Sequence, residues 1–225
     1  MPIEVTVEAA SKRAFASALD WPGWCRSGRD EDAALEALFE YGSRYARILD
    51  GSGVRFPLPV RASTLTVVER AKGDATTDFG APSISAKAEA APIDRRWLTR
   101  HETILRACWA ALDHAVEGVD GPLEKGPRGG GREVDAIVEH VVGAEGGYLR
   151  MIEGRPPAYR DGEAAALEEE RASVIEGLER ALVDGIPEKG PKGGARWSAR
   201  YFVRRAAWHV LDHAWEIEDR SSAGY

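Results

Sequence analysis

Hydrophobic and polar positions show both strand and helix periods before about residue 70, and a helix period alone from about residue 94. Over residues 3–8 and 13–20, apolar and β-branched side chains alternate with polar ones, which is typical of strands. From Asp30, a good helix cap, apolar residues recur at helical spacing as far as Leu49. Residues 65–68 have strand character again. The pattern predicts a small α/β unit of order strand, strand, helix, strand, with the helix laid across one face of the sheet.

The second half of the chain keeps a helical period to its end. Clusters of Gly and Pro divide it into four predicted helices, over Asp94–Val116, Arg132–Ile152, Glu163–Val183 and Arg196–Asp219. Four helices of this length, joined by loops of roughly 10 to 15 residues, suit a helix bundle. The predicted fold class is therefore α+β, a small α/β domain followed by an antiparallel up-down four-helix bundle.

An internal repeat supports this division. The segment EKGPRGGGR at residues 124–132 recurs as EKGPKGGAR at residues 188–196, each time directly before a predicted helix. The bundle is thus predicted to consist of two related helix pairs. Such Gly-rich loops can cradle an anion at a helix N-terminus, but they lack the P-loop spacing, so plain connectors are the favoured interpretation.

Composition changes between the two halves. Residues 71–93 are rich in Ala, Ser, Thr, Gly and Pro and contain few large apolar side chains, which is typical of a linker. The predicted organisation is an α/β domain over residues 1–70, a linker over residues 71–93 and a helical domain over residues 94–225.

Charge and composition narrow the function classes. The chain is 44% hydrophobic and 30% charged, and none of its apolar runs approaches the ~20 residues of a bilayer span. Its beginning shows no secretory signal, so a cytoplasmic location without membrane attachment is expected. A net charge of -7 opposes attraction to phosphates, which argues against a nucleic-acid ligand. The two cysteines, Cys25 and Cys108, form no metal-binding motif and are expected to be buried hydrophobes.

Five histidines fall within the predicted helical domain and are its strongest chemical signal. His209 and His213 are four residues apart, so their rings share one face of a helix and one metal ion can take both. His140, on another predicted helix, is the best candidate for a third ligand. Three imidazole nitrogens suit zinc or nickel and leave a coordination position for water or substrate. The alternative is that these are hydrogen-bonded packing residues.

Other residues have two interpretations each. Glu216 lies one turn after His213, where it could orient the imidazole or carry a proton, or could simply be a solvated or ion-paired glutamate. Arg204 and Arg205 could bind a carboxylate in bidentate fashion or form ion pairs on the helix surface. His101 and His114 are assigned to structure or surface, although an LDH motif shared with His213 could place His114 near the site.

Residues 15–49, FASALDWPGWCRSGRDEDAALEALFEYGSRYARIL, resemble the N-terminal domain of HicB antitoxins. The likeness consists of a strand, a D-x-P-G-like turn and a capped helix. It implies an α/β fold of the HicB kind and carries no implication of antitoxin activity.

A second resemblance covers residues 94–220. The pattern V-x-x-I-V-x-H-V-x-x-A-E around His140 and the H-x-x-x-H pair look like the DinB/YfiT-like family. The resemblance implies an antiparallel four-helix bundle, often a homodimer, with a divalent metal on His140, His209 and His213. The family includes enzymes that use a low-molecular-weight thiol, among them mycothiol-dependent maleylpyruvate isomerases and bacillithiol transferases.

The sequence therefore favours a cytoplasmic, metal-dependent enzyme of the DinB type that acts on a small-molecule substrate. A transferase or isomerase that depends on a low-molecular-weight thiol is the leading hypothesis. The alternative is a non-catalytic binding or regulatory module in which the bundle is a dimerisation scaffold.

Overall fold

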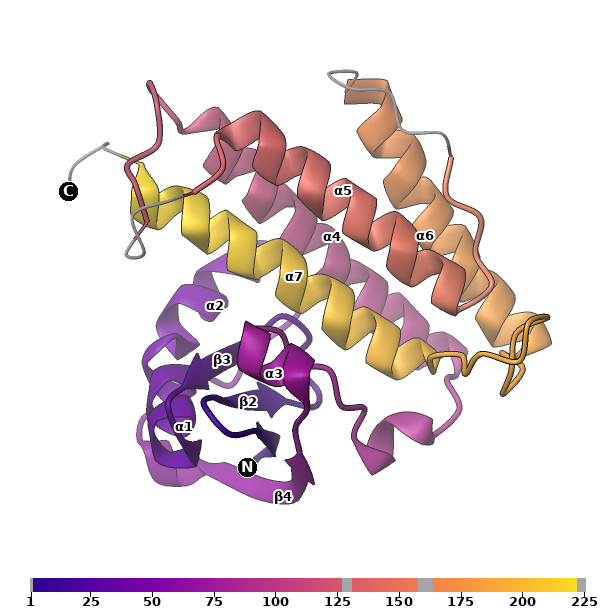
Figure 1. Cartoon of the computed structure of the whole chain (residues 1–225), viewed down its shortest axis with the longest axis horizontal. Coiled ribbons are helices and arrows are strands. Elements are labelled where there is room, and N and C mark those ends of the chain that lie inside the picture. Colours follow the sequence, from indigo (N-terminus) through magenta and orange to yellow (C-terminus); the bar gives the residue numbers. More distant parts are fainter. Residues whose placement is uncertain (1, 127–130, 158–163, 222–225) are drawn as a thin grey trace.

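The computed structural model describes residues 2–126, 131–157 and 164–221, and it has an α+β fold (Figure 1). A four-stranded mixed sheet forms the N-terminal part, and long helices follow it. The strands are β1 (Ile3–Ala9), β2 (Ala14–Ala18), β3 (Cys25–Gly28) and β4 (Leu65–Lys72). Their order in the sheet is β3-β2-β1-β4, with β1 antiparallel to β2 and parallel to β4. The coarse α+β class expected from the sequence is confirmed.

Helices cover both faces of this sheet. On one face lies α1 (Glu31–Glu40), which the side chain of Asp30 caps as predicted, and which contacts β2 and β3. On the other face, the ring of Phe15 in β2 meets Trp208 of the last helix edge to face, at 5.9 Å between ring centroids. Every residue of β2 is therefore buried, because alternate side chains reach different helices.

The single helix predicted as far as Leu49 is two helices in the structure. The first ends at Tyr41, and α2 (Gly42–Ile48) begins directly after it. The Tyr41 ring packs against Trp215 of the last helix, with 5.1 Å between ring centroids. The interruption between α1 and α2 thus occurs where Tyr41 contacts the last helix. Local periodicity does not encode such a long-range contact.

The segment predicted as a linker contains regular structure. It holds the end of β4, then α3 (Ala75–Phe79) and a short 3-10 helix, η2 (Lys87–Ala90), while another 3-10 turn, η1 (Ala62–Thr64), precedes β4. The carboxylate of Glu8 in β1 accepts hydrogen bonds from the backbone N–H groups of Ser83 (3.0 Å) and Ile84 (2.8 Å). Residues 71–93 are therefore tied to the sheet, whereas the division of the chain into domains at this point stays a prediction.

Four long helices follow, close to their predicted positions. They are α4 (Arg95–Glu117), α5 (Val134–Met151), α6 (Ala164–Asp184) and α7 (Ala199–Arg220). Figure 1 shows α7 between the sheet on one side and α4 and α5 on the other. The first Gly-rich repeat falls partly outside the described residues, and the second forms a small loop closed by a bridge between Lys189 and Ala195.

The four helices do not alternate strictly up and down. At the start of α7, Arg200 donates to the carbonyl groups of Ala91 and Pro92, just before α4, and at its end Arg220 O accepts from Glu124, just after α4. Helices α4 and α7 therefore run in the same direction. The ion pair between Arg171 and Asp113 joins the early part of α6 to the late part of α4, so α6 runs against them.

Helix α5 also runs against α7, because Trp197 at the start of α7 donates to the carbonyl of Met151 at the end of α5. The expected strict up-down alternation is therefore wrong, because α4 and α7 run in one direction and α5 and α6 run in the other. The long connections between helices permit this, since a connecting chain advances about 3.3 Å per residue and a helix only about 1.5 Å.

One apolar core joins the sheet to the helices. Its buried cluster includes Val5, Leu38, Leu105, Phe202 and Leu211. Among the residues that the structure describes, no helix combines the length and the apolar composition needed to cross a bilayer.

Candidate metal centre

Two helices supply the three histidines that the sequence singled out. Helix α7 begins at Ala199, directly after Ser198, whose side chain caps it by accepting a hydrogen bond from the N–H of Tyr201. The helix carries His209 and His213 one turn apart. Helix α5 packs against α7 and carries His140. Because α5 and α7 are antiparallel neighbours, the three rings meet between them.

The ring nitrogens are close enough for one ion. One nitrogen from each of the three histidines lies within 4.8 Å of the other two. The Nε2 atoms of His140 and His209 are 3.2 Å apart. Two nitrogens that each lie ~2.05 Å from a tetrahedral zinc would be about 3.3 Å apart. The observed separation fits two ligands of one ion.

The site is open on one side. His209 is buried, with 6% of its surface exposed, whereas His140 and His213 are partly exposed. The centroid of the His140 ring lies 5.0 Å from the ring centroid of His209 and 5.0 Å from that of His213. Three protein ligands with access from solvent leave a position for water or a small molecule, which distinguishes catalytic from closed structural zinc sites.

Electrostatics favour neutral imidazoles, which are the form that binds metals. Burial lowers the pKa of His140 below its ordinary value, and the neighbouring His213 acts in the same direction. Burial also lowers the pKa of His209, well below its ordinary value. Both rings therefore present a lone pair at neutral pH.

A carboxylate orients the third ring. The Nδ1 of His213 lies 2.8 Å from Oε2 of Glu216, and this hydrogen bond lowers the pKa of Glu216. The other oxygen of Glu216 accepts from Arg220, also at 2.8 Å. Because Nδ1 donates to the carboxylate, Nε2 of His213 keeps its lone pair. The contact with His213 matches the interpretation in which Glu216 orients the imidazole, and the contact with Arg220 matches the interpretation of an ion-paired glutamate.

Arg220 connects this chain of contacts to α5. Its guanidinium donates to the carbonyl of Arg132, directly before α5, and to the carbonyl of Glu124. The end of α7 is thus held against the start of the helix that carries His140.

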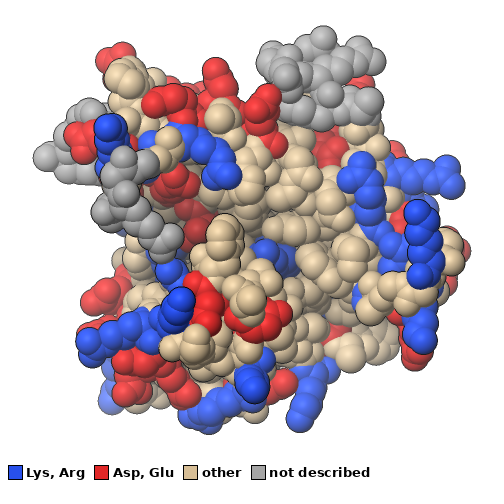
Figure 2. Space-filling model, viewed as in Figure 1, with Lys and Arg blue, Asp and Glu red and all other residues tan. Residues whose placement is uncertain are grey.

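Two aromatic rings and Arg205 lie on the side of the site formed by His209. The rings of Tyr148 and Trp208 lie 5.8 and 5.9 Å from that of His209. Arg205 lies one turn before His209, beside both rings. Figure 2 shows mostly uncharged atoms over the middle of this face, around a recessed patch of basic atoms, with charged side chains gathered toward its left side.

The structure separates the two arginines that the sequence treated together. Arg204 points the opposite way and binds Glu89 of η2, with Nη2 to Oε2 at 3.0 Å and a shorter Nε to Oε1 contact. Both members of this pair are buried, with 3% and 4% of their surfaces exposed. Glu89 therefore pairs with the guanidinium of Arg204, and of these two arginines Arg205 is the one that lies near the histidines.

The remaining histidines lie elsewhere. His101 is buried and stacked on Trp97, with 3.8 Å between ring centroids, and its Nδ1 bonds to the carbonyl of Trp97. Burial lowers the pKa of His101 to about 3, so it stays neutral. Both contacts are structural, as the sequence analysis expected.

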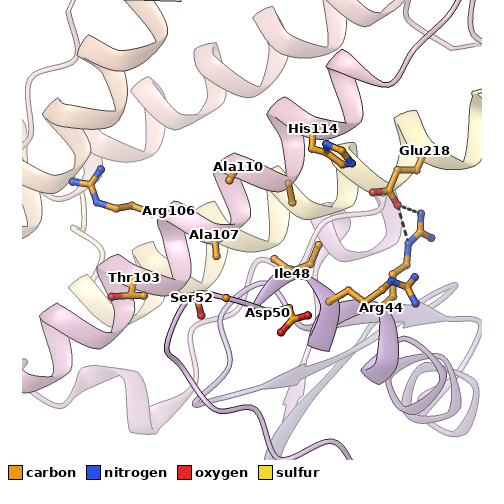
Figure 3. A pocket seen from close by; sticks show the side chains of 13 residues that line it. Arg44, Ile48, Asp50, Ser52, Thr103, Arg106, Ala107, Ala110, His114 and Glu218 are labelled. Atoms are coloured by element: carbon orange, nitrogen blue, oxygen red, sulfur yellow. Dashed lines mark hydrogen bonds and ion pairs between the residues drawn. The ribbon is translucent and has the colours of Figure 1, made fainter.

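His114 is exposed and lines a groove of about 730 Å³ between α2 and α4 (Figure 3). Alanines of α4 form the floor of the groove, and Arg44, paired with Glu218, stands at one end. The groove is lined by none of the three clustered histidines. The LDH motif therefore does not bring His114 to the cluster.

Sequence reasoning missed a second group of buried polar residues. Glu145 of α5 is 1% exposed and accepts a hydrogen bond from Nε1 of Trp109 at 2.8 Å, and burial raises its pKa to about 7. Glu170 of α6 is also buried, and burial raises its pKa to about 7. The sequence signal that could have identified these residues is a glutamate on the apolar face of α5 and another on the apolar face of α6.

Both cysteines are free and buried, as expected. Burial raises the pKa of the Cys25 thiol to about 12, so it is not a nucleophile at neutral pH.

Comparisons of this chain with family models, with curated proteins and with solved structures give no match. The functional argument therefore rests on the geometry of the site.

Proposed function

We propose that this protein is a metal-dependent enzyme of the DinB type, with one divalent ion bound to His140, His209 and His213. The observation that carries the proposal is the convergence of three ring nitrogens from two helices to within 4.8 Å of one another. In the same proposal, α4 to α7 are the four-helix bundle of that family. Zinc or nickel is the expected ion.

Bound there, the ion would supply Lewis acidity and lower the pKa of a thiol or water at its open position. The chain's own residues then have defined tasks. Glu216 keeps the Nδ1 proton of His213 and fixes the orientation of that ring. Tyr148 and Trp208 flank the buried ring of His209 and limit the access of water to it.

The substrate is a small molecule in this proposal, and the co-substrate is a low-molecular-weight thiol, so that the reaction is a group transfer or an isomerisation. The partly exposed His140 and His213 support this, since they leave the site accessible to molecules of that size. Neither cysteine of the chain can supply the thiol, because both are buried. A thiol nucleophile therefore has to come from outside the chain.

Elemental analysis of the protein purified without chelators tests the proposal. We expect about one first-row ion per chain in the wild type. The variants His140→Ala and His209→Ala should lose the ion, whereas His114→Ala, which changes the exposed histidine of the α2–α4 groove, should keep it. Equal metal content in all four proteins would contradict the site. Protein that stays metal-free even after incubation with zinc and nickel would favour the non-catalytic binding module instead.

A further inference from the structure

Arg205 is a buried cation beside the three histidines. It lies four residues before His209 on α7, so the two side chains share one face of the helix, about 6 Å apart along the axis. Only 8% of its surface is exposed. Its guanidinium carbon lies 4.6 Å from the ring centroid of Trp208 and 5.2 Å from that of Tyr148.

Within the described residues, Arg205 forms no ion pair with a carboxylate, and its Nη1 is buried without a hydrogen-bond partner. The other arginines of α7 have acceptors. Arg204 binds Glu89, Arg200 binds two backbone carbonyls, and Arg220 binds Glu216. Arg205 interacts with the hydroxyl group of Tyr148, but its buried Nη1 has no acceptor among the described residues.

An unpaired buried charge lowers stability, because it has lost water without gaining an anion. Aromatic rings offset part of this cost and hold the planar guanidinium in one orientation. The guanidinium of Arg205 is thereby preorganised to bind an anionic ligand. A carboxylate is the matching partner, since its two oxygens accept from two parallel N–H groups.

We propose that Arg205 binds a carboxylate of the small molecule that reacts at the histidine cluster. The inference rests on the proposed function and names the chemical class of its ligand. The spacing of one helical turn between Arg205 and His209 requires a ligand in which the carboxylate and the reacting atom are separated by a few bonds. Arg205 thereby selects short carboxylic acids over neutral molecules of the same shape.

Two small thiols that differ only in charge test this inference. The protein is loaded with Co²⁺, and 3-mercaptopropionate and 3-mercaptopropionamide are titrated while the sulfur-to-cobalt absorption band is recorded. The wild type should bind the carboxylate about tenfold more tightly than the amide, as expected for a charge-assisted bidentate pair. Arg205→Met should remove this preference and retain the cobalt. Arg180→Met, which changes an exposed arginine of α6, should keep the preference.

Arg205→Lys is the second variant, for use where the methionine variant does not fold. Lysine keeps the charge and lacks the planar fork, so the preference should shrink without vanishing. Equal affinities for the two thiols in the wild type would overturn the inference, as would a full preference in both Arg205 variants.

A metal-free arm separates this inference from the proposed function. If the wild type takes up no cobalt, the metal proposal fails, and the thermal midpoint is then measured in sodium propionate and in sodium chloride of equal ionic strength. A higher midpoint in propionate for the wild type and not for Arg205→Met supports the carboxylate site on its own. The same midpoint in both salts overturns it.

Discussion

Glu216 and His213 form the contact that sets the chemistry of the histidine cluster, with 2.8 Å between Oε2 and Nδ1. A neutral imidazole has one protonated nitrogen, and the partner of Nδ1 decides which one it is. With the proton held at Nδ1, the lone pair of Nε2 is available to a metal ion. Such outer partners are known to raise the affinity of the ligand they orient.

Replacing Glu216 by Gln should therefore weaken metal binding without abolishing it. We expect a loss of ~10- to 100-fold in affinity, because the amide accepts the Nδ1–H bond but carries no negative charge. Competition with a chromophoric chelator measures it. Glu218→Gln is the matched control on the same helix, since Glu218 pairs with Arg44 away from the histidines. Equal affinity in the Glu216 variant and the wild type would show that the contact is only structural.

Glu145 should contribute stability that falls as the pH rises, in the opposite direction to the buried histidines, whose pKa values are lowered. Burial raises its pKa from 4.5 to about 7, so the folded protein holds a proton that the unfolded chain releases above about pH 4.5. The contribution is complete below pH 4.5 and is lost as the pH rises through 7.

Urea unfolding of the metal-free protein at pH 5 and pH 8 measures this loss. Relative to the wild type, Glu145→Gln should shift the difference in stability between the two pH values by up to about 3 kcal/mol in favour of pH 8, because the amide stays neutral and still accepts from Trp109. Glu168→Gln, at an exposed position of α6, should leave the pH dependence unchanged. The same pH dependence in Glu145→Gln and in the wild type would contradict the assignment to Glu145.

The buried pair of Arg204 and Glu89 should be sensitive to the loss of either partner. Arg204→Met leaves the Glu89 carboxylate buried without its cation, which typically costs ~3 to 5 kcal/mol. Arg106→Met, which breaks an exposed pair with Glu102, should cost less than about 1 kcal/mol. Denaturant unfolding measures both.

The double variant Arg204→Met, Glu89→Gln completes the cycle. It should be destabilised by clearly less than the sum of the two single changes, because no buried charge is then left alone. Additive losses would show that the two side chains act independently.

Gly23 should not tolerate a larger residue. Its φ of +92° is unfavourable for other residues, and an added Cβ would lie 2.7 Å from Cδ1 of Leu211 on α7. Gly23→Ala should destabilise by more than about 2 kcal/mol through strain and overpacking together. Gly51→Ala separates the two effects, since Gly51 has a φ of +73° and open space around it. Equal losses in thermal midpoint for both variants would mean that packing against Leu211 is unimportant.

Local signals in the sequence were enough to predict most of the elements. The strand alternation of residues 3–8, the cap at Asp30 and the apolar stripes of the four long helices are all properties of neighbouring residues. Their period depends on backbone geometry alone. The shared face of His209 and His213 follows from the same periodicity, so it too could be predicted.

Contacts between distant residues decided the rest. Strand β3 is too short to show alternation and forms because β2 pairs with it. The break at Tyr41 and the ordering of residues 71–93 occur where segments meet partners far away in the chain. The parallel direction of α4 and α7 likewise depends on the paths of the long loops that connect the helices. Local propensity does not specify those paths.

The candidate site combines both levels. Local sequence patterns supply the side chains: two histidines one turn apart on a helix, and a third on another helix. Packing between distant segments brings Nε2 of His140 to 3.2 Å from that of His209 and places Glu216 against the His213 ring. It also pairs Glu89 with Arg204, so that Arg205 has no carboxylate partner among the described residues. The physical reason is that helical spacing fixes angles within one element, whereas the packing of α5, α7 and η2 fixes distances between elements.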